Sequence, residues 1–493
     1  MQRFQNFIDN QYQDAADGQC LDSYDPYLAK PWAQIPRSNA QDADQAVEAA
    51  HRAFLSPEWS GLTASERGRL LMRFADLLET KAEELARIET RDNGKLYAEM
   101  LAQLSYIPSF YRYFGGLADK LEGNVVPIDK PDIFNFNQYE PLGVIAAITP
   151  WNSPIFLATF KLAPLLSAGN TVVIKPSEHA SCSTLAFAKL FAEAGFPAGV
   201  VNVVTGLGQE VGARLVSHPK VAKVAFTGGE PGARSICEAV AGDFKPVLLE
   251  LGGKSANIVF EDAIIPDAIS GAISGIFAAS GQSCIAGSRL LVHESLYDDF
   301  VSTLVNTVKD AVIGNPMEEG SQIGPVTTHH QYEKILQYIE IAKSEGARCV
   351  LGGKASDRPG CETGWFVEPT IFANVTNDMR IAQEEVFGPI LAVIPFKDED
   401  EAIKIANDSP YGLAAGLWTQ NIGRALRVSK ALQAGTVWVN TYRMLSYMSP
   451  FGGYKRSGIG RENGNHALLE FVQQKSVWIN TSTASTANPF VMR

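Results

Sequence analysis

Residues 143–178, GVIAAITPWNSPIFLATFKLAPLLSAGNTVVIKPSE, decide the fold. Two short runs rich in β-branched residues, GVIAAITP and TVVIKPSE, flank a helix-length stretch of small and apolar residues. A strand, a helix and a strand at this spacing predict a parallel β-sheet covered on both faces. The pattern continues through GVVNVVTG, VAKVAFTGG and PVLLELGG, which predicts a first α/β domain.

A second set of strand-like runs follows: SRLLVHES, FVEPTIFANV, PILAVIPF, AAGLWTQ and GTVWVNT. Two α/β domains that meet near residues 252–255 are the economical interpretation. Segment 121–140 is polar and rich in β-formers, with Phe134, Phe136 and Gln138 in alternation, and we expect an inserted β arm there. The late strand KSVWIN is expected to pair with this arm or with another subunit, because an exposed strand edge usually finds a partner.

Two helical stretches are expected at the start of the chain. The second opens with TASE at residues 63–66, which has the pattern of a capping box. Its apolar face is expected to carry Leu70, Phe74, Leu77 and Leu78.

Composition narrows the function classes. The chain has 493 residues, of which 46% are hydrophobic and 19% charged, as expected for a globular enzyme of two or three domains. A net charge of -12 without a basic run argues against nucleic-acid and membrane partners. No signal peptide or membrane span is evident, so a cytoplasmic protein is expected. Six scattered cysteines without CxxC spacing, and the lack of HExxH, suggest neither disulfides nor a metal site.

One cysteine raises a specific question. Cys284 lies in FAASGQSCIAGSR, at the end of a long apolar stretch, and a thiol needs a base because its ordinary pKa is about 8.5. Glu250 in LLELGGK is flanked by leucines, so partial desolvation should raise its pKa toward the range useful for a base. From these residues alone, Cys284 is also compatible with a small buried hydrophobic residue.

Three further segments have the composition of a cofactor site. TPWNSP (149–154), KPSE (175–178) and FTGGEPGAR (226–234) follow predicted strands, and ligands of parallel sheets bind beyond the carboxyl ends of strands. The glycine-rich turn opens a helix whose N-terminal amides can face a pyrophosphate. In VVTGLGQEVG the third glycine falls one residue late for GxGxxG, which indicates mainly a turn.

Seven motifs together resemble those of the NAD(P)-dependent aldehyde dehydrogenase superfamily. They are TPWNSP, KPSE, FTGG, LELGGK, GQSC, EEVFGP (384–389) and PFGGYKRSGIGRE (450–462), in the family's order and approximate spacing. The resemblance implies an NAD-binding Rossmann-like domain (1–120 and 142–252), an α/β catalytic domain (253–456) and a β oligomerisation arm (121–141 and 470–493).

The resemblance also implies a thiol mechanism. Cys284 is expected to attack the aldehyde and form a thiohemiacetal, which becomes a thioacyl-enzyme. Glu250 is expected to activate water to hydrolyse it, and Asn152 with the Cys284 N–H to hold the oxyanion. Two alternatives use the same fold: a cofactor-independent thiol esterase and a non-catalytic structural protein.

NAD is the expected cofactor, with NADP possible, because a carboxylate at Glu178 repels a 2'-phosphate. Lys175 and Glu178 are assigned to the adenosine ribose, with Lys175 also a candidate catalytic residue, and Glu385 to the nicotinamide ribose. The implied cofactor-binding residues are Thr149, Trp151, Lys175, Ser177, Glu178, Gly208, Phe226, Thr227, Gly228, Gly229, Leu251, Glu385 and Phe387.

The sequence departs from the family pattern at several places. Ala233 stands where the glycine turn usually has its second glycine; an extra methyl at the closest pyrophosphate approach can shift how the cofactor lies, but binding is still expected. Ser153 stands where many relatives have an aromatic residue, and Arg443 lies in the loop that resembles the substrate entrance. We expect a small-molecule aldehyde substrate, such as a catabolic semialdehyde or hydroxylactone, and a homodimer or homotetramer. The candidate substrate-binding residues are Ser153, Leu157, Phe160, Ser283, Ile285, Arg443 and Phe451.

Overall fold

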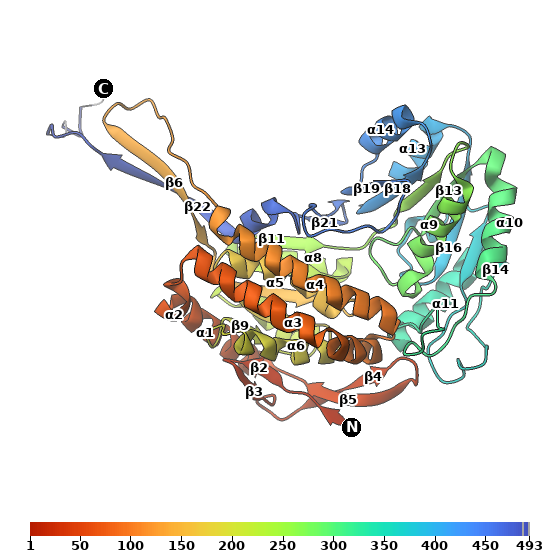
Figure 1. Cartoon of the computed structure of the whole chain (residues 1–493), viewed down its shortest axis with the longest axis horizontal. Coiled ribbons are helices and arrows are strands. Elements are labelled where there is room, and N and C mark those ends of the chain that lie inside the picture. The colour runs from red at the N-terminus through yellow and green to blue at the C-terminus, as the bar shows by residue number, and fades with distance from the viewer. Residues whose placement is uncertain (486–487, 492–493) are drawn as a thin grey trace.

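The computed structural model describes residues 1–485 and 488–491 and contains two α/β bodies with a projecting arm (Figure 1). Residues 486–487 and 492–493, at the end of the predicted arm, lie outside the described residues. The mixed α/β class with parallel sheets is therefore confirmed.

The first body is built on an eight-stranded sheet with the order β21-β11-β10-β7-β8-β9-β2-β3. Its five central strands pair in parallel, whereas the outer strands pair antiparallel. These strands are β2 (Asn6–Ile8), β3 (Gln11–Gln13), β7 (Val144–Thr149), β8 (Thr171–Pro176), β9 (Val201–Val203), β10 (Val221–Thr227), β11 (Val247–Glu250) and β21 (Gly458–Ile459). Its helices are α1 (Ala40–Leu55), α2 (Pro57–Ser60), α3 (Ala64–Asn93), α4 (Tyr97–Leu117), η1 (Ala118–Lys120), α5 (Pro154–Ser167), α6 (Cys182–Glu193), η2 (Gly208–Gly212), α7 (Ala213–Ser217), α8 (Glu230–Val240) and η3 (Ala241–Asp243).

The strand order of the first sheet reverses between β7 and β10. From β7 the chain adds β8 and β9 on one side and then returns to add β10 and β11 on the other. Such a reversal leaves a crevice beyond the carboxyl ends of the two strands. TPWNSP and FTGG follow these two strands, so the topology brings both motifs to the crevice.

The second body is built on a seven-stranded sheet with the order β14-β15-β16-β13-β12-β18-β19. Strands β12 and β14 were not anticipated from the sequence, and only β14 pairs antiparallel. The strands are β12 (Ala256–Val259), β13 (Arg289–His293), β14 (Arg348–Leu351), β15 (Thr370–Ala373), β16 (Ile390–Phe396), β18 (Ala414–Trp418) and β19 (Thr436–Val439). The helices are α9 (Ile265–Phe277), η4 (Ala278–Gly281), η5 (Glu294–Leu296), α10 (Tyr297–Val308), α11 (His329–Ser344), α12 (Arg380–Gln383), α13 (Glu399–Asn407) and α14 (Ile422–Ala431).

After the second sheet the chain returns to the first. Strand β17 (Tyr411–Gly412) pairs with β20 (Tyr454–Lys455), and β21 then pairs with β11, with Gly458 opposite Glu250. The 3-10 helix η6 (Asn465–Phe471) leads into the last strand. This return places the end of the PFGGYKRSGIGRE motif beside the strand that carries Glu250.

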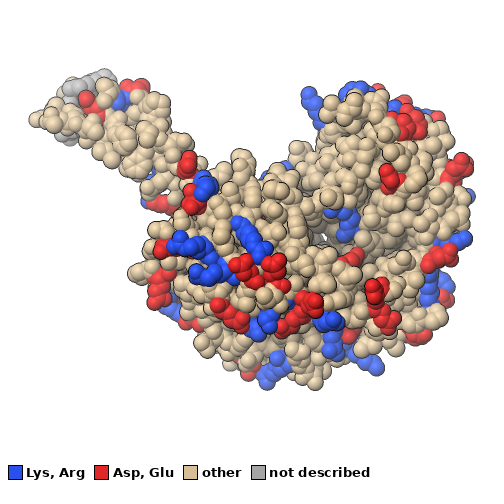
Figure 2. All heavy atoms as spheres, in the orientation of Figure 1, with Lys and Arg blue, Asp and Glu red and all other residues tan. Residues whose placement is uncertain are grey.

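The arm consists of β6 (Ile133–Pro141) and β22 (Val472–Asn480), which pair antiparallel over their whole length. The late strand therefore pairs with the predicted arm of its own chain, one of the two expected outcomes. Within the predicted arm segment the regular strand covers only residues 133–141, and residues 121–132 join the ribbon through an isolated bridge from Val125 to Phe136. The arm projects from the first body and carries few charged side chains on the face seen in Figure 2.

The expectation that helices come first is wrong. Strands β1 (Gln2–Arg3) to β5 precede α1, and β2 and β3 extend the edge of the first sheet. Strands β4 (Cys20–Asp25) and β5 (Lys30–Pro36) form a separate sheet with β1. Short strands of mixed polarity carry no clear two-residue period, so sequence patterns do not reveal them.

Helix α3 begins where the capping box predicts. The Thr63 side chain accepts from the Glu66 N–H, and the Glu66 carboxylate accepts from the Thr63 N–H at 2.8 Å. Leu70, Phe74 and Leu78 are buried, whereas Leu77 is half-buried. The amphipathic face therefore packs this helix onto the first body.

Over residues 1–485 and 488–491, we find no helix whose length and apolar character would suffice to cross a membrane. The same residues contain no cluster of three or more His, Cys, Asp or Glu side chains arranged to hold a metal ion.

We predict that Thr63→Ala loosens the first turn of α3. Loss of an N-cap hydroxyl costs about 1 kcal/mol, or roughly a fivefold change in local opening. Hydrogen–deuterium exchange of the first-turn amides should therefore become several-fold faster. Thr80→Ala, an exposed mid-helix change whose hydroxyl only bonds the Leu77 carbonyl, is the control. Equal exchange in both variants would contradict the assignment.

Candidate active site

A left-handed turn presents Cys284. Helix α9 ends at Phe277, and Ala279, Ser280 and Gly281 then take positive φ values of 55°, 52° and 71°. Such residues cost roughly 1–3 kcal/mol each where they are not glycine, so the surroundings must hold them. Glu99 accepts from the Ala279 N–H at 2.8 Å, and the Ser280 hydroxyl donates to the Gly324 carbonyl at 2.7 Å. The turn is thus fixed by α4 and by a distant loop.

Glu250 is the last residue of β11 and is 1% exposed. Neither of its carboxylate oxygens accepts a hydrogen bond from the described residues. Burial raises the pKa of Glu250 well above its ordinary value, and the Glu462 carboxylate adds to the rise, while Lys161 and the Cys284 thiol oppose it. A carboxylate with a raised pKa is a stronger base, so the expectation from its leucine neighbours agrees with the geometry.

Cys284 is half-buried. Burial raises the pKa of its thiol well above the ordinary value, and the nearby Glu250 and Glu385 carboxylates raise it further. The thiol is therefore protonated near neutral pH, and forming the nucleophilic thiolate requires a base beside it. The packed-hydrophobe alternative does not explain why this side chain lines two cavities.

Asn152 follows β7 and is 6% exposed. One of its amide N–H groups donates to the Gln282 carbonyl at 3.0 Å, which ties it to the cysteine loop. The backbone N–H of Cys284 donates to none of the described residues. Together with Glu250, these groups line a cavity of about 190 Å³, so three distant segments meet at one place.

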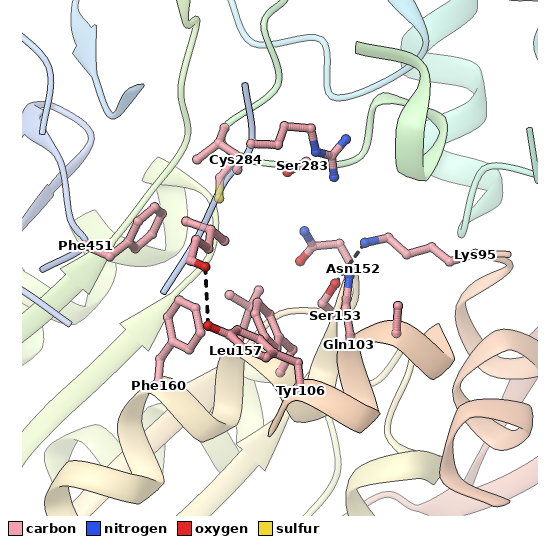
Figure 3. A pocket seen from close by; sticks show the side chains of 15 residues that line it. Lys95, Gln103, Tyr106, Asn152, Ser153, Leu157, Phe160, Ser283, Cys284 and Phe451 are labelled. Carbon is pink, nitrogen blue, oxygen red and sulfur yellow. Dashed lines mark hydrogen bonds between the residues drawn. The ribbon is translucent and has the colours of Figure 1, made fainter. Parts of the chain in front are cut away.

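A second cavity, of about 310 Å³, shares Cys284, Asn152 and Leu157 with the first. Figure 3 shows Phe160, Leu157 and Phe451 on one side of it and Lys95, Ser153 and Asn152 on the other. All seven residues predicted to bind substrate line this cavity: Ser153, Leu157, Phe160, Ser283, Ile285, Arg443 and Phe451.

The predicted cofactor residues divide between two cavities. A third cavity, of about 740 Å³, is lined by Lys175, Glu178, Gly208 and Phe226. The cavity that holds Glu250 and Asn152 is lined by Trp151, Thr227, Gly228, Gly229, Leu251, Glu385 and Phe387. Thr149 and Ser177 line neither: Thr149 has a buried hydroxyl without a partner, and the Ser177 hydroxyl accepts from the His179 N–H at 3.4 Å.

Lys175 and Glu178 form an ion pair of 3.0 Å at the third cavity. Burial alone would raise the pKa of Glu178, but the Lys175 ammonium, a backbone hydrogen bond and His179 together leave that pKa below its ordinary value. Burial lowers the pKa of Lys175, against the pull of Glu178. Lys175 does not line the cavities that contain Cys284, so its position favours a cofactor-binding role over a catalytic one.

Ala233 does not line the third cavity. Its side chain is 4% exposed and packs in the core beneath α8, whereas Pro231 and Gly232 line the third cavity. The expectation that this methyl group affects how a cofactor lies stays a prediction. Gly229, the N-cap of α8, has no side chain to bond the free N–H groups of the first turn, so these donors remain available to an anion.

Glu385 reaches across from the second body. Its carboxylate accepts from the Gly253 N–H at 2.9 Å. A Cβ on Gly252 would lie 2.3 Å from the other Glu385 oxygen, so only glycine leaves room for this side chain. Burial raises the pKa of Glu385, against the Gly253 N–H, Lys334 and Lys254.

The sequence analysis missed a buried ion pair next to Glu250. Lys161 donates to Glu462 at 2.5 Å and also to the Thr227 hydroxyl, and both charged side chains are at most 2% exposed. A lone lysine in the apolar stretch 154–167 was the available signal. It also missed Lys95 and Gln331, because these cavity residues belong to none of the quoted motifs.

Comparisons with known proteins agree with this geometry. Residues 12–477 match the family model described as "Aldehyde dehydrogenase family". The chain is 47% identical to the (Z)-2-((N-methylformamido)methylene)-5-hydroxybutyrolactone dehydrogenase of Acinetobacter baylyi, over all of both chains. It superposes with a TM-score of 0.96 and 44% identity on the crystal structure of a putative aldehyde dehydrogenase from Burkholderia cenocepacia, over all of both chains. An NAD+ complex of aldehyde dehydrogenase from Bacillus cereus matches with a TM-score of 0.95 and 44% identity, over 98% of this chain and 97% of that one.

We predict that Gly281→Ala destabilises the turn that presents Cys284. Its φ is 71°, and a Cβ there would lie 2.0 Å from the Gly388 carbonyl oxygen. An unfavourable backbone conformation alone costs about 1 kcal/mol, and the steric overlap adds to it. The apparent melting temperature should therefore fall clearly below that of wild type. Gly320→Ala, where no atom lies within 4 Å, is the matched control, and equal melting temperatures would refute this account.

Proposed function

The chain belongs to the aldehyde dehydrogenase family, and from this premise we propose that it oxidises an aldehyde to the carboxylic acid with NAD+ and water. The observation that carries the proposal is the meeting of Cys284, Glu250 and Asn152 where two cavities join. One cavity is available to the aldehyde and the other to the nicotinamide.

The first chemical step forms a bond from the Cys284 sulfur to the aldehyde carbon. The thiol proton passes to Glu250, and the carbonyl oxygen becomes an oxyanion. The Asn152 amide and the Cys284 N–H, which has no other partner among the described residues, stabilise this charge. The product of the step is a thiohemiacetal on Cys284.

NAD+, when bound, supplies the two-electron oxidant that accepts the hydride from this carbon. The carbonyl re-forms as a thioester on Cys284. Glu250, after releasing its proton to solvent, then removes a proton from water, and the hydroxyl group adds to the thioester. The carbon–sulfur bond breaks, and the proton that Glu250 took from water passes to the departing sulfur, which frees the acid and returns the thiol.

The first body has the groups that NAD requires. Glu178 can accept hydrogen bonds from a ribose diol, and the free N–H groups of α8 suit a pyrophosphate. The two cavities adjoin at the turn after β10, because Gly228 and Gly229 line one and Pro231 and Gly232 the other. The carboxylate of Glu178 favours NAD over NADP. We accordingly propose that residues 1–120 and 142–252 bind NAD and that residues 253–456 supply the nucleophile.

Family membership does not favour the thiol esterase or the non-catalytic protein. We propose that the chain forms a homodimer or homotetramer through the β arm. The arm is a two-stranded ribbon in which β22 has no second strand partner among the described residues and β6 has only the isolated bridge from Phe136 to Val125, and it exposes Phe134, Trp478 and Ile479.

We propose a semialdehyde or a hydroxylactone as the substrate. A 5-hydroxybutyrolactone, named in the Acinetobacter baylyi relative, is the cyclic form of a 4-oxo acid, so ring opening yields an aldehyde and a carboxylate. Arg443 lines the substrate cavity and uses one nitrogen, Nη1, to bond the Ser274 and Ala278 carbonyls at 3.1 and 3.2 Å. Its other donors have no partner among the described residues, which leaves them for a substrate oxygen.

We predict that Glu250→Gln slows both steps in which Glu250 takes up a proton, deprotonation of the Cys284 thiol and hydrolysis of the thioester. Loss of a general base typically costs at least about 100-fold, so kcat should fall by at least that factor, and any acyl group that forms on Cys284 should persist. Intact-protein mass spectrometry after mixing with NAD+ and aldehyde measures the adduct. Cys284→Ser should form neither adduct nor NADH, and the exposed Glu193→Gln serves as control. A Glu250→Gln enzyme with wild-type kcat would contradict the role.

We predict that Arg443→Ala selectively impairs acidic aldehydes. A hydrogen bond to a charged group contributes about 1.5–3 kcal/mol, so kcat/KM for 4-oxobutanoate should fall at least tenfold more than for its methyl ester. Arg443→Lys, which keeps the charge, should recover part of the loss, and the exposed Arg348→Ala is the control. Equal changes for acid and ester would remove Arg443 from substrate recognition.

A further inference from the structure

The substrate cavity carries an unbalanced positive charge. Lys95 and Arg443 both line it, and none of its lining residues is Asp or Glu. The chain as a whole carries a net charge of -12, so this local balance is opposite to that of the molecule. A low-dielectric cavity with two cations and no anion favours an anionic ligand.

Neither cation is neutralised by a direct ion pair. Within the described structure, no carboxylate oxygen lies within 4.0 Å of the Lys95 or Arg443 nitrogens, although salt bridges are formed by many other basic residues. Lys95 is 3% exposed, and its ammonium donates to the Ser153 hydroxyl at 2.8 Å. A buried ammonium whose one side-chain partner is a neutral hydroxyl has donors left for a further partner.

The nearest acids compensate Lys95 only in part. The Glu99 carboxylate acts on both Lys95 and Arg443, so a single acid is shared between two cations. Burial raises the pKa of Glu89 to about 7, so this carboxyl is partly neutral at physiological pH. Neither residue lines the cavity, whereas Lys95 does.

Ser153 gives Lys95 access to the substrate space. It is the N-cap of α5, and its short side chain makes no capping hydrogen bond, so its hydroxyl is engaged with Lys95 instead. Figure 3 shows the Lys95 ammonium approaching the cavity beside Ser153 and Asn152, opposite the Phe160 and Phe451 rings. A larger side chain at position 153 would stand between the ammonium and the cavity.

We propose that Lys95, which lines the cavity beside Ser153, acts with Arg443 as a second binding group for the carboxylate of a short ω-oxo acid. This inference rests on the proposed function and identifies the residue pair that selects its substrate class. The apolar wall of Phe160, Leu157 and Phe451 holds the carbon chain, and the aldehyde carbon lies at Cys284. A volume of about 310 Å³ is at the small end for ligand sites, which favours a short chain over a bulky aldehyde.

The test compares 4-oxobutanoate with its methyl ester, measured as NADH formed by the full-length enzyme. Lys95→Met removes the charge at similar length, and we expect the ratio of kcat/KM for acid over ester to fall at least tenfold. Lys95→Arg should restore most of the ratio. Lys309→Met, an exposed lysine far in sequence from the site, is the control and should keep the wild-type ratio. If Lys95→Met lowers kcat/KM equally for the acid and the ester, Lys95 does not bind the carboxylate and the proposal is overturned.

A pH profile of the wild-type enzyme tests the same inference without a variant that could misfold. Burial and, to a smaller extent, the charge of Arg443 lower the pKa of Lys95 to about 8. Glu99, Glu89 and Cys284 oppose this shift. Lys95 is charged below this pKa and attracts a carboxylate; above it the attraction is lost. The acid-to-ester ratio of kcat/KM should therefore fall as pH rises through about 8. Titration of Cys284 and Glu250 affects the acid and the ester equally, so it does not change this ratio.

The possible failures are distinguishable. A ratio that stays flat to pH 9.5, or a wild-type enzyme that oxidises the ester but not the acid, overturns the role of Lys95 and leaves aldehyde oxidation standing. A wild-type enzyme that forms NADH with neither compound nor with any aldehyde of a short-chain panel overturns the proposed function and this inference with it.

Discussion

Burial of the Glu250 carboxylate beside the Cys284 thiol, without a hydrogen-bond partner among the described residues, is the constraint on which the rest of the site depends. Desolvation disfavours the charged form of both groups, so each keeps its proton longer than in water. The thiol is therefore a weaker acid, and the carboxylate a stronger base, than in water. The pair supports catalysis only where a proton can pass between the two groups or to water. The surrounding fold must therefore keep the place dry while two cavities open onto it.

The topology meets this requirement by bringing together the ends of two strands of the first sheet and a loop of the second body. Asn152 follows β7, Glu250 ends β11, and the cysteine loop follows α9 of the second body. The chain then returns through β21, which places Glu462 against Lys161 deep in the first body. Buried ion pairs gain little net stability because desolvation offsets their attraction, so this pair is better understood as setting the charge around Glu250 than as holding the fold together.

Charge is distributed unevenly between the molecule and its substrate cavity. The acidic surface, seen with mixed signs in Figure 2, contrasts with a cavity lined by Lys95 and Arg443 alone among charged residues. The contrast arises locally, because Ser153 is small enough to leave the Lys95 ammonium beside the cavity. Substrate selectivity in this site therefore depends on which polar groups line the cavity, whereas Cys284, Glu250 and Asn152 can act on any aldehyde.

The sequence by itself determined the parallel sheets, the capped helix at Thr63, the β arm and the motifs that carry Cys284, Glu250 and Asn152, because these depend on short-range periodicity and local residue type. It did not determine the short N-terminal strands, whose pairing depends on partners far along the chain, or the inward packing of Ala233. Lys95, in the connection between α3 and α4, and Lys161, in α5, were also not predicted, because neither belongs to one of the motifs and the sequence does not show which groups surround a lysine in space. Only the tertiary structure decided which charges lie together, because the electrostatic effect of a side chain depends on its neighbours in space and on the water they exclude.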